Sequence, residues 1–184
     1  TGVKEIRNTH ERIRSLGQPN PFSSVEPEII ANLLGRGGLL SKKFPGYESR
    51  DEQLTMSQSV AKAFGSTKQQ INPHHLIVEG GTGIGKSVAY LLPAILFAIR
   101  NNVRVVISTN TISLQEQLVN KDIPDLLGSL AEIENVDISD FRYTLLKGKA
   151  NYVCLKRWES LSNSEAITSN EALTLAKTLT WLGT

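Results

Sequence analysis

A stretch of glycines with a lysine and a serine, GGTGIGKS at residues 80–87, has the residue types and spacing needed to bind phosphate. Gly80, four further residues, and then Gly85, Lys86 and Ser87 satisfy the pattern G-x-x-x-x-G-K-[ST]. In this pattern backbone N–H groups surround the phosphates, the lysine reaches the β- and γ-phosphates, and the serine hydroxyl binds Mg²⁺. We expect Lys86 and Ser87 to be catalytic; a flexible glycine loop without a ligand is the alternative. The expected nucleotide-binding residues of the stretch are Gly80, Gly81, Thr82, Gly83, Ile84, Gly85, Lys86 and Ser87.

Such a loop needs a strand that leads into it and a helix that follows it. Apolar and β-branched residues at 74–80 predict the strand, and the spacing of apolar residues at 85–100 predicts the helix. The alternation of strands and helices predicts an α/β fold with a parallel sheet, whose ligands lie at the carboxyl ends of the strands. Further strands are predicted at 103–109 and 141–148, further helices at 27–35, 49–64 and 113–127, and a wholly helical region at 151–182.

Composition sets limits on the class of protein. A chain of 184 residues is expected to form one main globular unit, and its 20 basic and 18 acidic residues favour no class of partner. No apolar stretch reaches the roughly 20 residues of a membrane span, so we expect no membrane partner. The single cysteine fits a reducing compartment, and the cytoplasm is the expected location. The first residue is Thr1, and a helical pattern runs out at the last residues, so the sequence is interpreted as a fragment.

Four segments around the loop, taken in their order along the chain, indicate one class among the many proteins that contain such a loop. They are FPGYESRDEQLTMSQSVAKAF, HHLIVEGGTGIGKSVAYLLPAIL, VISTNTISLQEQLVNKDIP and LLKGKANYVC. Between about residues 29 and 157 the chain resembles the amino-terminal part of the DinG/XPD branch of superfamily-two DNA helicases. The resemblance implies a partial RecA-like domain that binds ATP and Mg²⁺ and acts on single-stranded DNA. Gly80 stands where this family commonly has alanine, and Ile84 where threonine or valine is common.

The resemblance also implies a residue pair that recognises the base of the nucleotide. Arg50 and Gln53 match the family's Q-motif, in which the glutamine amide pairs with adenine and selects ATP. Tyr47 or Phe44 is expected to cover the base. The alternative is that Arg50 and Gln53 are solvated residues at the start of a helix.

Two regions are expected to bind single-stranded DNA. Thr109 and Asn110 lie in the STNT segment, which in the family holds the nucleic-acid backbone; the alternative is that Asn110 or Thr111 only caps the next helix. Lys147 and Lys149 are expected to contact DNA phosphates. With Lys156, Arg157, Tyr152 and Trp158 they form a mixture of basic and aromatic residues that also fits a solvated helix face with two core aromatics.

Cys154 ends the KGKANYVC segment. In the family the corresponding cysteine is the first of four thiolate ligands of a [4Fe–4S] cluster, and the other three are expected beyond Thr184. The alternative is a small buried apolar residue. The expected organisation is therefore a linker or tail at 1–26, the first part of a helicase domain at 27–150, and the start of an iron–sulfur region at 151–184.

These features together predict part of an ATP-dependent DNA helicase that moves along single-stranded DNA and unwinds duplexes. No segment resembles the family's magnesium-binding aspartate and catalytic glutamate, so the chain alone is expected to be inactive. A P-loop phosphotransferase acting on a small molecule and a non-enzymatic nucleotide-binding module remain the alternatives. The oligomeric state is not indicated.

Overall fold

The computed structural model describes residues 18–43, 46–65, 75–133, 136–164 and 166–183. It divides into two units, Thr1–Tyr143 and Thr144–Thr184. The first unit contains the helices α1 to α6, and the second contains a short 3-10 turn and two helices. Their bounds are α1 Pro27–Leu34, α2 Leu39–Lys43, α3 Asp51–Phe64, α4 Lys86–Asn101, α5 Ile112–Gln117, a π-helical turn Leu118–Asp122, α6 Ile123–Leu130, the 3-10 turn Lys149–Asn151, α7 Leu155–Ser162 and α8 Ser169–Gly183.

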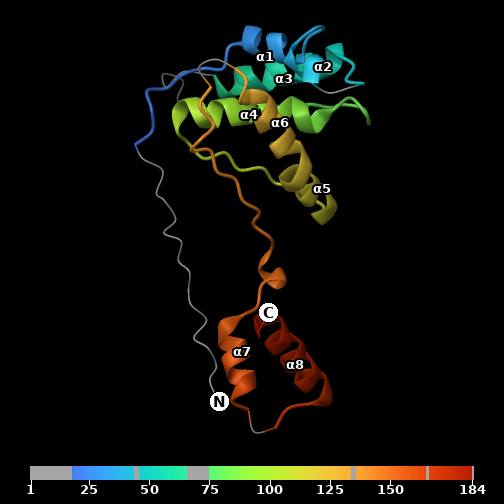
Figure 1. Cartoon of the computed structure of the whole chain (residues 1–184), viewed down its shortest axis with the longest axis vertical. Coiled ribbons are helices and arrows are strands. Elements are labelled where there is room, and N and C mark those ends of the chain that lie inside the picture. The colour runs from blue at the N-terminus through green and yellow to red at the C-terminus, as the bar shows by residue number, and fades with distance from the viewer. Residues whose placement is uncertain (1–17, 44–45, 66–74, 134–135, 165, 184) are drawn as a thin grey trace. The chain divides into compact units, whose positions relative to one another are not determined.

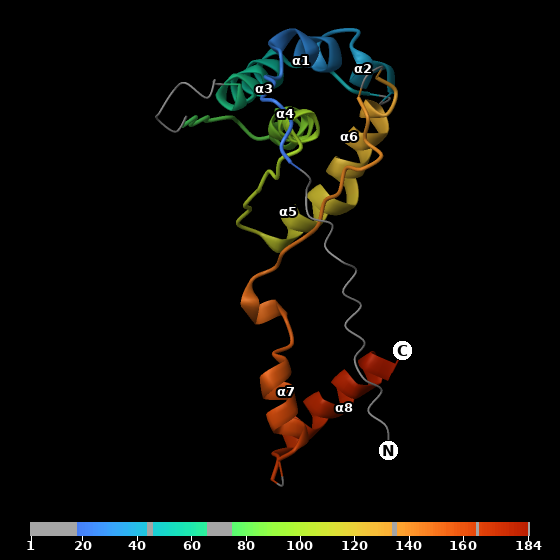
Figure 2. The same cartoon turned by 90° about the vertical axis from the view of Figure 1, so that its left-hand side faces the viewer.

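Helices α1, α3 and α4 form the centre of the first unit. In both views α3 lies between α1 and α4 and contacts each of them (Figures 1 and 2). The buried face of α3 consists of Gln53, Ser57 and Ala61, which are spaced four residues apart. α3 makes its most extensive contacts with α4. The hydrophobic core contains Val25, Ile30, Leu33, Leu34, Leu40, Ala61, Leu91, Leu92, Ile95, Leu96, Leu118, Ile123, Leu126 and Leu130.

The ends of α4 follow from local sequence. Gly85 precedes the helix with a left-handed backbone (φ 81°), and Asn102 ends it in the same region (φ 50°). Asparagine tolerates this conformation better than most residues other than glycine. The predicted helix at 85–100 is therefore confirmed, with Pro93 accommodated inside it.

A buried asparagine joins the segment before α1 to the end of α4. Asn101 is 3% exposed, and its Oδ1 accepts a hydrogen bond from the Ser23 backbone N–H at 2.7 Å. Its Nδ2 donates to the carbonyls of Ser23 and Phe97 at 2.9 and 3.0 Å. Both donor hydrogens of the amide and one acceptor site of its oxygen are thus used, and the segment around Ser23 is fixed on α4.

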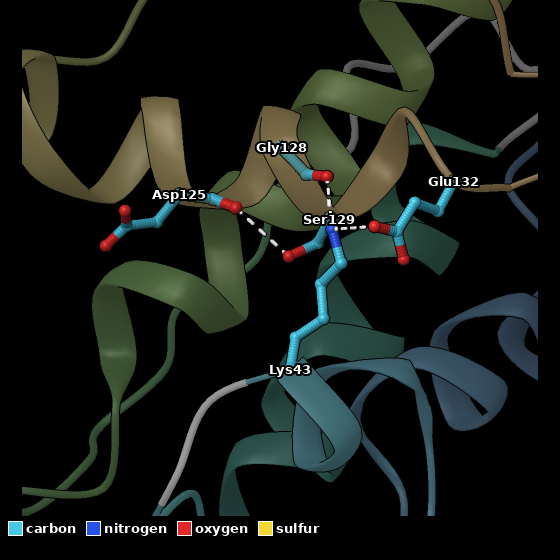
Figure 3. A network of polar contacts seen from close by, with 5 residues as sticks. All are labelled: Lys43, Asp125, Gly128, Ser129 and Glu132. Atoms are coloured by element: carbon cyan, nitrogen blue, oxygen red, sulfur yellow. Dashed lines mark hydrogen bonds and ion pairs between the residues drawn. The ribbon is translucent and has the colours of Figure 1, made fainter.

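The short helix α2 was not predicted from the sequence, and its last residue, Lys43, connects it to α6. Residues 39–43 lie in what reads as an irregular connection, yet they form α2. Lys43 at the end of α2 donates to the carbonyl of Gly128 in α6 and pairs with Glu132 at 2.8 Å (Figure 3). In the same network the Ser129 hydroxyl donates to the Asp125 carbonyl at 3.0 Å. A cation near the C-terminal carbonyls of α6 is favourable for the helix dipole.

The predicted parallel sheet is absent from the residues that the structure describes, so the α/β fold class is wrong, and with it the RecA-like expectation. The described parts of the three predicted strands, 75–80, 103–109 and 141–148, are neither helix nor strand. A strand needs a hydrogen-bonded neighbour. Among the described residues, no backbone hydrogen bond joins these three segments to one another.

The side chains of these segments explain the difference further. Ile77, Val106 and Leu146 are 96%, 90% and 80% exposed, whereas a sheet covered by helices would bury them. The buried faces of α3 and α4 instead pack against other helices of the unit. The helices predicted at 27–35 and 49–64 are confirmed as α1 and α3.

The helix predicted at 113–127 begins and ends within three residues of its observed bounds, and the sequence also predicts that it is interrupted near Pro124. A π-helical turn at Leu118–Asp122 joins α5 to α6, and Pro124 is the second residue of α6, directly after that turn. In the second unit, α7 and α8 confirm most of the predicted helical region. Among the described residues, no helix combines the length and apolar character needed to cross a membrane.

Candidate nucleotide-binding site

The glycine-rich loop leads directly into the longest helix of the first unit. Residues 80–85 are non-helical, and α4 begins at Lys86. Among the described residues, no side chain caps the N-terminus of α4. The N–H groups of its first turn and the positive end of its dipole therefore favour an anion at this point.

Lys86 lies across the loop in this structure. Its ammonium group donates hydrogen bonds to the carbonyls of Gly80 and Gly81 at 2.8 and 2.9 Å. The side chain is exposed, so the charge is accessible from solvent. A phosphate would replace these two carbonyls as the partner of the ammonium group.

Ser87, the expected magnesium ligand, is half-buried and has a tyrosine partner. Its side chain is hydrogen-bonded to Tyr90, one turn later on α4. Burial raises the pKa of Tyr90, the bond to Ser87 lowers it, and the Asp122 carboxylate raises it. The sequence analysis missed Tyr90, although its spacing of three from Ser87 places both on one helix face.

Gln53 is the buried polar residue next to the loop. It is 4% exposed, and its Nε2 donates to the Gly85 carbonyl at 3.0 Å. Its Oε1 accepts from the Tyr47 hydroxyl at 2.8 Å. Arg50 is exposed and is the residue that precedes α3. Phe44, the other aromatic residue considered for the base, lies outside the described residues.

Most of the STNT segment is exposed. Thr111 caps α5 by accepting a hydrogen bond from the Leu114 backbone N–H at 3.3 Å, so the capping interpretation holds for this residue. Thr109 is half-buried and Asn110 is exposed. Both line a groove in the first unit together with Val60, Phe64, Tyr90, Ala94, Val105, Val106, Ile107, Ser108 and Leu114.

The remaining predicted residues belong to the second unit. Lys149 and Cys154 are exposed, and Lys147 is half-buried. The Lys147 backbone N–H donates to the Tyr152 hydroxyl at 2.8 Å, which closes the turn that contains Lys149. Of the two aromatics, Tyr152 is exposed and Trp158 is half-buried.

An iron–sulfur cluster does not fit the residues of this chain alone. Cys154 is the only cysteine, and it is free and exposed instead of buried. Within the described ranges no three histidine, cysteine, aspartate or glutamate side chains are grouped to hold a metal ion. His75 is exposed, while His10 and His74 lie outside the described residues.

Comparison with known proteins shows what the chain is similar to. The DEAD/DEAH box helicase family matches residues 60–136. The chain is 34% identical to the 3'-5' exonuclease DinG of Bacillus subtilis over 95% of its own length and 19% of that protein. The chain is DinG-like. It is also 38% identical to the ATP-dependent DNA helicase YoaA of Haemophilus influenzae (72% of the chain, 18% of the relative) and 44% identical to the ATP-dependent helicase DinG of Mycobacterium tuberculosis (61% and 16%).

This DinG-like chain spans less than one fifth of the length of these curated relatives. No solved structure matches it. The resemblance carried by the four sequence segments is thus confirmed.

Proposed function

We propose that the chain binds MgATP at the loop 80–87 and supplies the nucleotide-binding part of an ATP-dependent DNA helicase. The observation that carries the proposal is the position of the G-x-x-x-x-G-K-[ST] loop at the uncapped N-terminus of α4. The glycines give the phosphates access to the backbone, Lys86 supplies a positive charge, and Ser87 supplies a hydroxyl for Mg²⁺. Names of relatives support the same activity, since two of them are ATP-dependent helicases.

ATP hydrolysis coupled to movement along single-stranded DNA is the proposed reaction of the full-length protein. The residues of this chain bind and orient the phosphates. Lys86 exchanges its two carbonyl partners for phosphate oxygens, which are stronger acceptors because they are charged. No residue of the loop is placed to activate a water molecule, so we expect the 184-residue chain alone to bind nucleotide weakly and not to turn it over.

The test uses the full-length protein with Lys86→Ala and, as a matched control, Lys42→Ala, which removes an exposed lysine on α2. Titration with a fluorescent ATP analogue measures binding, and phosphate release with and without single-stranded DNA measures hydrolysis. We expect Lys86→Ala to lose DNA-stimulated hydrolysis and Lys42→Ala to retain it. Hydrolysis at the wild-type rate in Lys86→Ala would refute the proposal.

We propose that single-stranded DNA contacts Thr109 and Asn110 in the first unit and Lys147 and Lys149 in the second. The support is their exposed or half-buried position and, for Thr109 and Asn110, the adjacent start of α5. Asn110→Ala is expected to weaken binding of a single-stranded oligonucleotide of mixed sequence, with exposed Asn120→Ala as the control. Equal affinity in the two variants would count against a DNA contact at Asn110.

Cys154 is proposed to contribute one thiolate to an iron–sulfur cluster only if three further thiolates come from elsewhere in the protein. Its exposure supports this, since the thiol is accessible. Iron analysis of full-length protein purified without oxygen, compared with Cys154→Ser, is the test. An iron content that the substitution leaves unchanged would assign Cys154 to another role. The cytoplasm remains the proposed location.

A further inference from the structure

Helices α3 and α4 lie side by side and run in the same direction (Figures 1 and 2). Near their starts, the Gln53 amide donates to the Gly85 carbonyl at 3.0 Å. Near their ends, the rings of Phe64 and Phe97 are stacked with their centroids 4.9 Å apart. About three turns separate these two contacts on each helix, so the helices stay in register along their interface.

One turn beyond the first contact, this register places Ser57 of α3 opposite Ala89 of α4. Both residues are 0% exposed. The Ser57 hydroxyl has no hydrogen-bond partner among the described residues. Two other hydroxyls of the same helix, those of Thr55 and Ser59, each donate to the backbone carbonyl four residues earlier at 2.8 Å. A buried hydroxyl without an acceptor is costly, so gaining an acceptor in the ligand-bound state is favourable.

Pro93 leaves an acceptor on the facing side of the interface. In an α-helix the carbonyl of Ala89 accepts from the N–H of residue 93, but proline has no N–H. Ala89 and Pro93 are both buried, so water does not readily replace the missing donor. The interface thus holds a donor without an acceptor on α3 and an acceptor without its helical donor on α4.

A chain of helical hydrogen bonds connects the Ala89 carbonyl to the phosphate-binding end of α4. The Tyr90 N–H, which shares a peptide group with this carbonyl, donates to the Lys86 carbonyl in helical geometry. The peptide group of Lys86 carries the Ser87 N–H, one of the uncapped donors at the start of the helix. A phosphate that accepts from the Ser87 N–H polarises each bond of this chain in turn, so the Ala89 carbonyl becomes a stronger acceptor.

We propose that Ser57 is a positioning residue whose hydroxyl donates to the Ala89 carbonyl when phosphate binds at the start of α4. This inference rests on the function proposed for the loop 80–87 and adds a residue that lies outside the glycine-rich motif. The bond replaces the one that Pro93 removes and connects the phosphate to α3. Because it forms only with phosphate in place, its free energy contributes to ligand affinity and not to the stability of the free protein.

The experiment uses the full-length protein and two ligands, MgATP and magnesium tripolyphosphate, each measured by competition with a fluorescent ATP analogue. The urea midpoint without ligand measures stability. Ser57→Ala removes the proposed donor. Pro93→Ala supplies an N–H to the Ala89 carbonyl, so this carbonyl no longer needs Ser57. Ser59→Ala is the matched control, because it removes a hydroxyl of the same helix that bonds within α3.

We expect Ser57→Ala to weaken both ligands by the same factor of about three- to tenfold, which corresponds to the loss of one hydrogen bond. Its urea midpoint should be unchanged or higher. In the Pro93→Ala background, Ser57→Ala should change either affinity by less than about twofold, and Ser59→Ala should do the same in the wild-type background. This non-additivity separates the proposed bond from a general effect of packing.

Two outcomes overturn the proposal while leaving the function of the loop intact. In one, Ser57→Ala binds both ligands as tightly as the wild type. In the other, it weakens them equally with and without Pro93→Ala, as a change in packing does. If circular dichroism shows that Pro93→Ala is unfolded, Ser57→Ala decides the test: lost affinity at an unchanged urea midpoint supports the proposal, and a lowered midpoint overturns it. If the wild-type protein binds neither ligand, the function proposed for the loop fails, and the role of Ser57 fails with it.

Discussion

Replacing Gly85 by alanine tests the geometry of the loop through stability alone. Two independent costs arise at this position. Alanine must adopt φ 81°, which costs about 1–2 kcal/mol, and its Cβ would lie 2.0 Å from Nε2 of Gln53. Because Gln53 is buried, its amide cannot move into water, and losing its partner costs a further 1–3 kcal/mol or so. The expected destabilisation is therefore roughly 2–5 kcal/mol.

The neighbouring glycines provide matched controls. Gly83 has φ 84°, but a Cβ there would meet no atom within 4 Å, so Gly83→Ala should cost only the backbone term of about 1–2 kcal/mol. A Cβ on Gly81 would also meet nothing within 4 Å, and its φ is not positive. Gly81→Ala should therefore change stability by no more than about 1 kcal/mol.

Urea unfolding followed by far-ultraviolet circular dichroism measures the three variants. With a denaturant dependence of about 2 kcal/mol per molar, the midpoint should fall by about 1–2.5 M for Gly85→Ala and by about half that for Gly83→Ala. The double variant Gln53→Ala/Gly85→Ala should recover part of the difference, since the obstructing amide is gone. The reasoning is refuted if Gly85→Ala and Gly83→Ala are equally stable.

Four further predictions follow from other contacts. Lys86→Ala should leave the urea midpoint of the chain nearly unchanged, because the ammonium group is exposed, while a large loss of midpoint would assign Lys86 a structural role. Ser57→Ala should be neutral or stabilising by up to about 1 kcal/mol in urea, since the buried Ser57 hydroxyl has no hydrogen-bond partner among the described residues; a clear destabilisation would reveal a partner. Gly80→Ala should destabilise the fold, because a Cβ on Gly80 would lie 2.7 Å from Cδ1 of Ile84. Ile84→Val removes Cδ1 and should reduce this destabilisation in a double-mutant cycle, whereas additive effects would contradict the reasoning. Hydrogen bonds from Thr168 lower the pKa of Glu171, so the stabilisation of α8 should be full above the ordinary value of 4.5 and be lost as the pH falls through the lowered pKa; the helical signal of Glu171→Gln should lack this acid dependence.

The helices could be predicted because their signals are local. The apolar spacing at 49–64 and 85–100 needs only neighbouring turns of the same helix, and α3 and α4 begin and end within about two residues of the prediction. The strands could not be predicted in the same way, because pairing depends on a second segment far along the chain. The β-branched run around Val106 satisfies the pattern for a strand, but it has no hydrogen-bonded neighbour among the described residues.

The phosphate-binding loop could be predicted from its residue pattern, but the contacts that other residues make with the loop could not. Gln53 and Gly85 are 32 residues apart, and no spacing rule relates them. The expectation that Tyr47 covers a base stays a prediction, but the hydrogen bond of its hydroxyl to Gln53 could not be predicted from the spacing. Tyr90 was within reach of a sequence argument because it follows Ser87 by one helical turn.

The glycines of the loop show most clearly what a motif leaves out. In the pattern they look alike, but in the structure a side chain would meet Ile84 at Gly80, nothing at Gly81, only backbone strain at Gly83, and both strain and the Gln53 amide at Gly85. The first of these explains two departures from the family pattern together. Cδ1 of Ile84 occupies the space that the methyl group of the more common alanine would take, so glycine at 80 accommodates isoleucine at 84. Neither departure removes a phosphate ligand, because both positions would act through their backbone N–H groups.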